Sequence, residues 1–155
     1  MCILMTADEL HLLRKSFAKV EAMGHVGALL FYQRLFAVAP QVRPLFSTEI
    51  ETQSKKLTQM LTAVIGLAEK PEEFRATLEE LGARHVEYGA LPDHYPVVVD
   101  ALLHMLDKVL GPEFTPRLRH LWTGVLNTIA QMMMNGAEKA VRVPSSARCE
   151  RATLS

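Results

Sequence analysis

The 155-residue sequence lacks the features that mark several classes of protein. Lys plus Arg and Asp plus Glu both number 17, so the chain has no net charge. A general nucleic-acid binder needs a basic face to neutralise phosphates, and we therefore expect no nucleic-acid partner. No apolar run reaches the roughly 20 residues that a membrane-spanning helix requires. We therefore expect no membrane span.

Cysteine is also scarce, with only Cys2 and Cys149 at opposite ends of the chain. This placement makes a structural disulfide a poor expectation, and it provides no cysteine cluster for a metal. The N-terminal MCILM is too short for the core of a signal peptide and has no basic start. Free thiols fit a reducing compartment, and we expect a cytoplasmic protein.

No segment alternates apolar and polar residues as a strand would, so the predicted fold class is all-α. Apolar residues instead recur at helical spacing between clear start and stop signals. The predicted helices are one that starts at the Thr6–Glu9 capping box, one that Pro40 ends, one that Pro71 ends, one from about Glu73, one that opens at Pro92 and breaks at Gly111, and one that Thr115 caps.

The chain is predicted to form one domain over residues 1–140, since almost half of its residues are hydrophobic. Residues 141–155 are polar and uneven in composition, which predicts a disordered C-terminal tail. The short, proline-broken stretch from Pro40 to Phe46 does not suit a bundle of equal helices. It favours helices that cross at steep angles and leave a pocket.

One histidine lies on an apolar stripe. His85 shares a helix face with Leu78 and Leu81, where an imidazole costs free energy unless its nitrogens find partners. The ordinary interpretation is a core histidine bonded to a backbone carbonyl. A neutral imidazole beside an apolar wall is also the usual protein ligand of haem iron. His94, which follows Pro92 and Asp93, is expected to act as a cap or to pair with Asp93.

Two further polar residues lie on the apolar faces of other helices. Gln53 is one turn before Leu57, and the simplest interpretation is a helix-start residue that faces solvent. Tyr32 lies on a stripe with Leu35 and Phe36, and a buried tyrosine usually sends its hydroxyl to a carbonyl. Each residue alone has an ordinary explanation. Together with His85 they place an amide, a phenol and an imidazole on three inward faces.

Four segments resemble a known family. FYQRLFAVAPQVRPLF is similar to the second helix of bacterial single-domain globins and of the haem domain of flavohaemoglobins, through the phenylalanine that packs on haem. ARHVEYGALPDHYPVV resembles the region around their proximal histidine. TQSKKL and HLWTGVLNTIAQ resemble the distal helix start and the last helix, so that the resemblance covers about residues 6–140. It implies a globin fold of roughly six to eight helices around a pocket for one haem b.

The resemblance also implies roles for individual residues. His85 would be the proximal iron ligand. Tyr32 and Gln53 would be the distal hydrogen-bond donors, and they would be the catalytic residues if the protein is an enzyme. The other residues expected to contact the cofactor are Phe46 on the porphyrin, Leu57 closing the distal pocket, Leu81, Arg84 at a propionate and Tyr95 on the proximal side.

The sequence departs from the flavohaemoglobin pattern in its last helix. Leu126 stands where that group has a tyrosine. A gapless alignment puts Ala137 in the place of the glutamate that bonds the proximal histidine, with Glu138 one position later. One residue along a helix turns a side chain by about 100°. Glu138 is therefore not among the predicted site residues.

The implied function is the binding of diatomic gases, namely O2 with high affinity and also NO and CO. Phenol and amide donors stabilise the negative charge that develops on bound O2. NO dioxygenase-type detoxification would need a separate reductase protein, because the chain has no glycine-rich nucleotide-binding pattern. Whether the protein is an enzyme stays open. The alternatives are O2 storage or transport, gas or redox sensing, and a haem-free globin-like interaction module.

Overall fold

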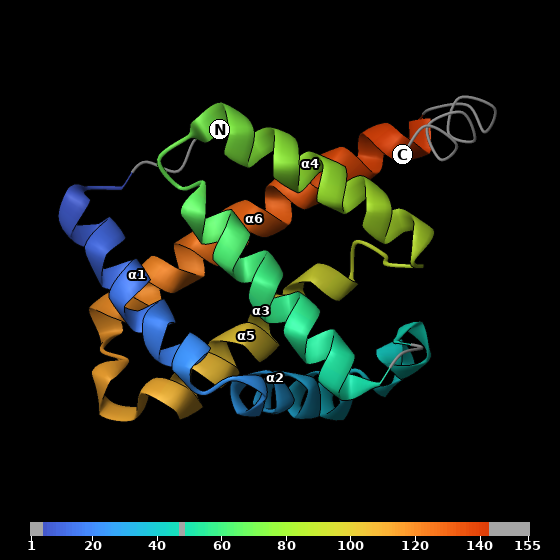
Figure 1. Cartoon of the computed structure of the whole chain (residues 1–155). Coiled ribbons are helices and arrows are strands. Elements are labelled where there is room, and N and C mark those ends of the chain that lie inside the picture. Colours follow the sequence, from blue (N-terminus) through green and yellow to red (C-terminus); the bar gives the residue numbers. More distant parts are fainter. Residues whose placement is uncertain (1–4, 47–48, 143–155) are drawn as a thin grey trace.

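The computed structural model describes residues 5–46 and 49–142, and within them every regular element is a helix (Figure 1). The elements are α1 Ala7–Ala22, α2 His25–Val38, η1 Pro40–Leu45, α3 Ile50–Gly66, α4 Pro71–Glu87, α5 His94–Leu110, η2 Gly111–Glu113 and α6 Pro116–Arg142. Six are α-helices, and η1 and η2 are short 3-10 helices. The all-α prediction is confirmed.

Local sequence signals set several helix ends. The Thr6 hydroxyl accepts the Glu9 amide at 3.1 Å, and the Glu9 carboxylate accepts the Thr6 amide at 3.0 Å. This is the predicted capping box, and it satisfies two amides that the helix itself leaves unpaired. The Thr115 hydroxyl accepts the Leu118 amide at 3.2 Å, as expected at the start of α6.

The prediction that Pro71 ends the third helix is wrong. α3 ends at Gly66, and Pro71 is instead the first residue of α4. Proline suits this position because the first turn of a helix leaves its amides unpaired in any case. The expected tail, residues 141–155, begins inside α6, which continues to Arg142. The rest of that segment lies outside the described residues, as do Cys2 and Cys149.

The helices cross one another instead of lying in an aligned bundle. Figure 1 shows α4 passing across α6 in the upper half of the molecule, with α3 running diagonally below α4. α2 packs on α5, and α1 packs on α5 and α6. None of the described helices combines the length and the hydropathy that crossing a membrane would require.

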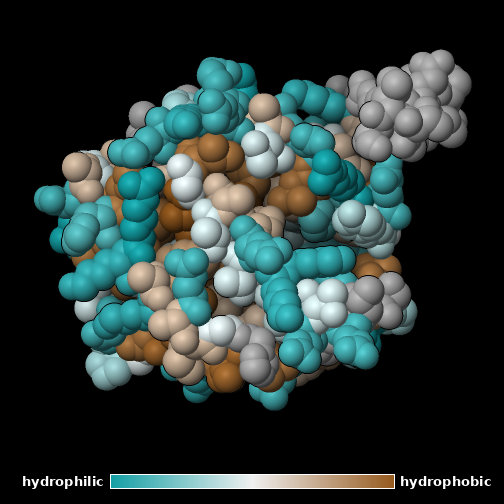
Figure 2. Space-filling view, in the orientation of Figure 1, coloured by the Kyte–Doolittle hydropathy of each residue, from teal (hydrophilic) through white to brown (hydrophobic). Residues whose placement is uncertain are grey.

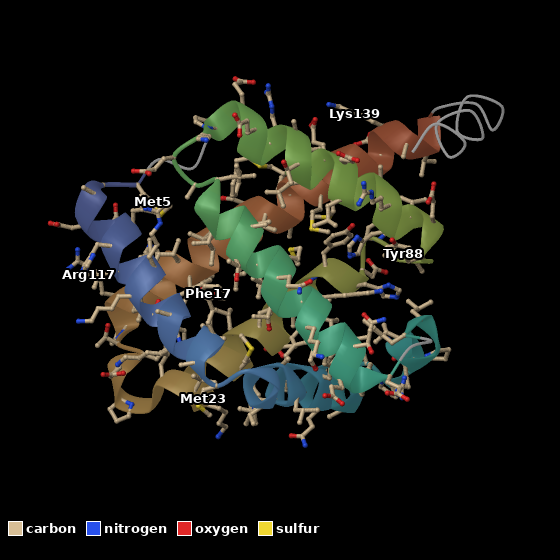
Figure 3. All side chains as sticks on the ribbon, in the orientation of Figure 1. Met5, Phe17, Met23, Tyr88, Arg117 and Lys139 are labelled. Atoms are coloured by element: carbon tan, nitrogen blue, oxygen red, sulfur yellow. The ribbon has the colours of Figure 1, made fainter. Side chains whose placement is uncertain are left out.

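The core draws apolar side chains from all six α-helices. Those below 2% exposure include Leu13, Leu35, Val64, Leu78 and Leu106. Figure 3 shows Phe17 of α1 pointing into this interior, where its ring centre lies 6.3 Å from that of Trp122 on α6.

The buried indole of Trp122 has a polar partner. Its Nε1 donates to the Ser16 hydroxyl at 2.9 Å, and that hydroxyl donates to the Leu13 carbonyl at 2.8 Å. This buried chain of hydrogen bonds joins α1 to α6 and leaves neither side-chain group unsatisfied.

Candidate functional site

His85 lies in the last turn of α4, half-buried, with its Nδ1 2.8 Å from the Leu81 carbonyl oxygen. A carbonyl oxygen can only accept, so Nδ1 carries the hydrogen of this bond. Nε2 is then the unprotonated nitrogen, because a neutral imidazole has one hydrogen on nitrogen. Burial lowers the pKa of His85, against a smaller opposing effect of the Leu81 bond. The ring is therefore neutral near pH 7 and has the tautomer that binds a metal through Nε2.

Tyr32 of α2 is brought next to Gln53 of α3. The buried phenol donates to the Gln53 backbone carbonyl at 3.2 Å. Its ring stacks on Phe36, with ring centres 5.8 Å apart, and meets Phe46 edge-on at 5.5 Å. Burial raises the pKa of Tyr32 to about 12, so the hydroxyl keeps its hydrogen at any ordinary pH. Three of the predicted site residues, Tyr32, Gln53 and Phe46, therefore lie together.

The hydroxyl of Tyr32 has the partner that the ordinary interpretation of a buried tyrosine predicts, a backbone carbonyl. Its single hydrogen would have to leave this carbonyl before it could be donated to a bound ligand. Gln53 is in the first turn of α3, and Leu57 follows one turn later on the same helix. Both residues are half-buried.

A pocket of about 110 Å³ lies between α3 and α4. It is lined by Met60, Ala63, Val64, Thr77, Glu80, Leu81 and Arg84. Figure 2 shows apolar side chains reaching the surface in this part of the molecule, bordered by polar ones. Two predicted site residues, Leu81 and Arg84, line this pocket, whereas His85, Tyr32 and Gln53 do not.

Arg84 is exposed and donates to the Glu80 carboxylate at 2.8 Å. The pocket therefore combines an apolar wall from α3 with polar and charged groups, including this guanidinium, from α4. This combination suits a flat apolar ligand that carries carboxylates, since the carboxylates could replace Glu80 as the partner of Arg84.

Tyr95, in the first turn of α5, is buried. Among the described residues its hydroxyl is a buried side-chain polar atom without a hydrogen-bond partner. Burial also raises the pKa of Tyr95. An unsatisfied buried hydroxyl costs about 1–3 kcal/mol, so this hydroxyl is available to a bound group.

Within the described part of the chain, no three or more His, Cys, Asp or Glu side chains gather where they could hold a metal ion. Among the described residues, His85 therefore belongs to no group of three such side chains. Such a site does not suit a bare ion, which needs several protein ligands. It suits a metal whose other ligands come from a macrocycle, as in haem. The tautomer of His85, the unpaired Tyr95 hydroxyl and the guanidinium of Arg84 all fit that group.

Sequence reasoning missed the aromatic neighbour of His85. The Tyr88 ring lies edge-on to the imidazole, with ring centres 5.7 Å apart, and the residue is 61% exposed at the end of α4 (Figure 3). The only available signal was its position three residues after His85, which places both side chains on neighbouring parts of the helix surface. His94 accepts the Leu91 amide through Nδ1 at 3.0 Å, as expected of a local cap.

The last helix differs from the flavohaemoglobin pattern in the structure as well. Glu138 is exposed on α6, and Leu126 is buried in the core. The Nδ1 hydrogen of His85 is already donated to the Leu81 carbonyl. That nitrogen therefore has a neutral backbone partner instead of a carboxylate.

Comparison with known sequences gives one family. The sequence model described as "Globin" matches residues 29–133. Proteins named "Flavohemoprotein" from Deinococcus radiodurans and Pseudomonas putida are 25% identical over 141 residues and 26% identical over 144 residues. These matches cover 89% and 88% of this chain but 35% and 36% of those proteins. The chain thus spans about a third of the length of the curated relatives that it matches.

Solved structures show the same fold. A bacterial globin from Campylobacter jejuni superposes with a TM-score of 0.77 at 22% identity, covering 89% of this chain and all of that one. A hexacoordinated heme protein from an anhydrobiotic tardigrade gives a TM-score of 0.78 at 14% identity, covering 86% of this chain and 96% of that one. An engineered carbene transferase from Rhodothermus marinus gives 0.77 at 23% identity, covering 89% and 96%. On the match to the family sequence model and on its fold, the chain belongs to the globin family.

Proposed function

We propose that this globin holds one haem b through Nε2 of His85 and binds O2, NO and CO. The observation that carries the proposal is the bond from Nδ1 to the Leu81 carbonyl, which leaves Nε2 unprotonated. Leu57, Leu81 and Phe46 would pack on the porphyrin, and Arg84 would meet a propionate. Tyr95 would lie on the proximal side. The names of the flavohemoprotein relatives and of the tardigrade heme protein support this choice of cofactor.

The haem iron would supply the position at which a diatomic gas binds, and Tyr32 would supply a hydrogen bond to that gas. The Gln53 carbonyl holds the Tyr32 phenol in place. The raised pKa of Tyr32 keeps the phenol protonated, so that it remains a hydrogen-bond donor. The hydroxyl hydrogen reaches a ligand by rotation about the phenol C–O bond, which gives up the Gln53 carbonyl. A hydrogen bond in a dry site is worth about 1–3 kcal/mol, so the effect on the rate of ligand release is at most roughly hundred-fold, because the loss of the Gln53 carbonyl bond offsets part of the gain.

Within this function, conversion of NO and O2 to nitrate is the activity that we favour. The relatives are named flavohemoproteins, and the Rhodothermus marinus protein is described as a candidate nitric oxide dioxygenase. The conversion of NO and O2 to nitrate consumes one electron, which a reductase would return to the protein in each turnover.

O2 storage is the second candidate, and one observation favours it. The Gln53 carbonyl competes with a bound gas for the Tyr32 hydrogen, which would speed ligand release. The two activities differ in the products that they give. Ferrous protein equilibrated with O2 is mixed with NO, and nitrate is measured with and without a reductase and its nicotinamide. Nitrate that exceeds the protein concentration only when the reductase is present supports the dioxygenase, and an absence of nitrate in both reactions contradicts it.

The haem-free interaction module makes a different prediction. Purified protein, or protein mixed with haemin, should show an intense Soret band if the proposed cofactor is correct. A preparation that is colourless, and that stays colourless after haemin is added and unbound haemin is removed, would contradict our proposal and support the haem-free module.

A further inference from the structure

The helix that carries His85 touches α6 backbone to backbone. A Cβ atom added to Gly82 of α4 would lie 1.8 Å from the Met133 carbonyl oxygen of α6. A Cβ atom added to Gly136 of α6 would lie 1.9 Å from the Glu79 carbonyl oxygen of α4. Each helix therefore places a glycine Cα against a carbonyl of the other. This reciprocal arrangement is typical of close helix crossings with weak Cα–H···O contacts.

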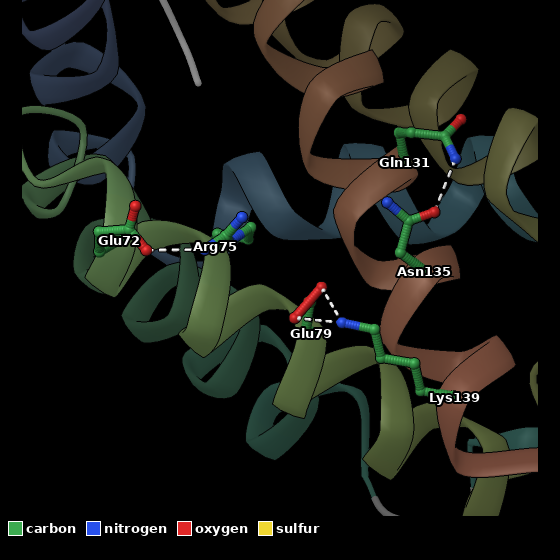
Figure 4. A network of polar contacts seen from close by, with 6 residues as sticks. All are labelled: Glu72, Arg75, Glu79, Gln131, Asn135 and Lys139. Atoms are coloured by element: carbon green, nitrogen blue, oxygen red, sulfur yellow. Dashed lines mark hydrogen bonds and ion pairs between the residues drawn. The ribbon is translucent and has the colours of Figure 1, made fainter. Parts of the chain in front are cut away.

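This crossing belongs to the most extensive contact between any two helices of the described structure. A second interaction lies beside it. Lys139 donates to both oxygens of the Glu79 carboxylate, at 2.9 and 3.1 Å, from one turn beyond Gly136 (Figure 4). The Glu79 side chain is only 23% exposed, but Lys139 is largely exposed. Ion pairs with an exposed partner contribute little by themselves, so the backbone contact is the part that fixes the distance between the helices.

His85 is attached rigidly to this crossing. It follows Gly82 by three residues, less than one turn along α4. Its imidazole is tied through Nδ1 to the Leu81 carbonyl of the same helix, so that the ring keeps its orientation relative to the α4 backbone. A displacement of α4 away from α6 is therefore passed on to Nε2.

We propose that Gly82 and Gly136 are positioning residues for the proximal ligand, and that their crossing sets the position of His85 Nε2 at the iron. This inference rests on the proposed function, in which His85 binds haem iron. A methyl group at either glycine forces carbon and oxygen apart by more than an ångström, because non-bonded atoms do not approach as closely as 1.8 Å. Since the obstacle is backbone, no side chain can rotate to relieve it.

The test compares two alanine substitutions on α4 and α6 with a matched control. Gly82→Ala and Gly136→Ala both add a methyl group at the crossing. Gly124→Ala adds the same group to α6 at an exposed position with nothing within 4 Å of the new carbon. The readout is the iron–histidine stretching band of the ferrous holoprotein in resonance Raman spectra. We expect the band to shift in both crossing variants and to stay at the wild-type frequency in Gly124→Ala.

A further variant separates the charge pair from the glycines. Glu79→Gln removes the charge next to Lys139 and adds nothing at the crossing, so the band should stay unshifted. The inference is overturned if folded Gly82→Ala and Gly136→Ala keep the wild-type band. It is also overturned if both variants lose their helical circular dichroism, since the glycines would then serve stability alone. If only one of the two variants folds, the inference is judged on the iron–histidine band of that variant.

Failure of the underlying function would look different. A wild-type holoprotein that lacks the iron–histidine band contradicts ligation by His85. A wild-type band that does not respond to the crossing variants contradicts only the positioning role.

Discussion

At the scale of single residues, the form of His85 depends on two neighbours. The Leu81 carbonyl selects the tautomer, and the apolar environment keeps the ring neutral. The same carbonyl bond is what an ordinary core histidine would make, which is why the sequence left both interpretations open. The tautomer of His85 favours haem ligation only when it is combined with two other observations. These are the Tyr95 hydroxyl without a described partner and the pocket lined by Leu81 and Arg84.

The lowered pKa of His85 predicts a dependence of stability on pH. Because the unfolded chain takes up a proton near its ordinary pKa of about 6.5 and the folded chain does so only at lower pH, folding is disfavoured as the pH falls below about 6.5. The contribution of His85 is fully present above that value. Urea unfolding of the polypeptide without cofactor should show a smaller loss of unfolding free energy between pH 7.5 and 5.5 in His85→Gln than in wild type. Equal losses would contradict the assigned burial.

Tyr32 gives a second prediction at this scale. Tyr32→Phe keeps the ring between Phe36 and Phe46 but removes the hydroxyl, so O2 should dissociate faster, by up to roughly a hundred-fold, in stopped-flow measurements. Tyr88→Phe makes the same chemical change on an exposed ring and should leave the rate unchanged. An unchanged rate in Tyr32→Phe would remove this phenol from the ligand site.

At the scale of elements, local signals predicted several helix ends, although the helix expected to open at Pro92 begins at His94. The Thr6 capping box, the break at Gly111 and the Thr115 cap act through neighbouring residues, so the sequence alone reveals them. Pro71 was assigned to the wrong helix because proline fits both the end of one helix and the first turn of the next. The role of Gly136 could not be predicted, since its partner, Glu79, lies 57 positions earlier in the sequence.

The two glycine environments predict opposite effects of one substitution. Gly124 lies inside α6 with open space around it, so Gly124→Ala should raise the free energy of unfolding by about 0.5–1 kcal/mol through helix propensity. Gly82→Ala gains the same propensity but meets the Met133 carbonyl and should destabilise the fold. Denaturant unfolding of both variants measures the difference. Equal effects would mean that the helices do not meet at Gly82.

At the scale of the whole molecule, the site depends on contacts between distant segments. Tyr32 and Gln53 come from different helices, and the sequence placed them together only through its resemblance to globins. Helical periodicity could show that each residue faces inward, but it could not show which inward faces meet. The fold class was therefore predictable from local pattern, whereas the composition of the site required a family resemblance.

The proposed function depends most on His85 as a protein ligand of the haem iron. The most direct measurement is the absorption spectrum of ferric and ferrous His85→Ala beside wild type, after both are loaded with haemin. We predict that the variant loses the bound pigment or shows a changed axial-ligand spectrum, while its circular dichroism stays helical. A variant that keeps its pigment with the wild-type spectrum would contradict the central claim.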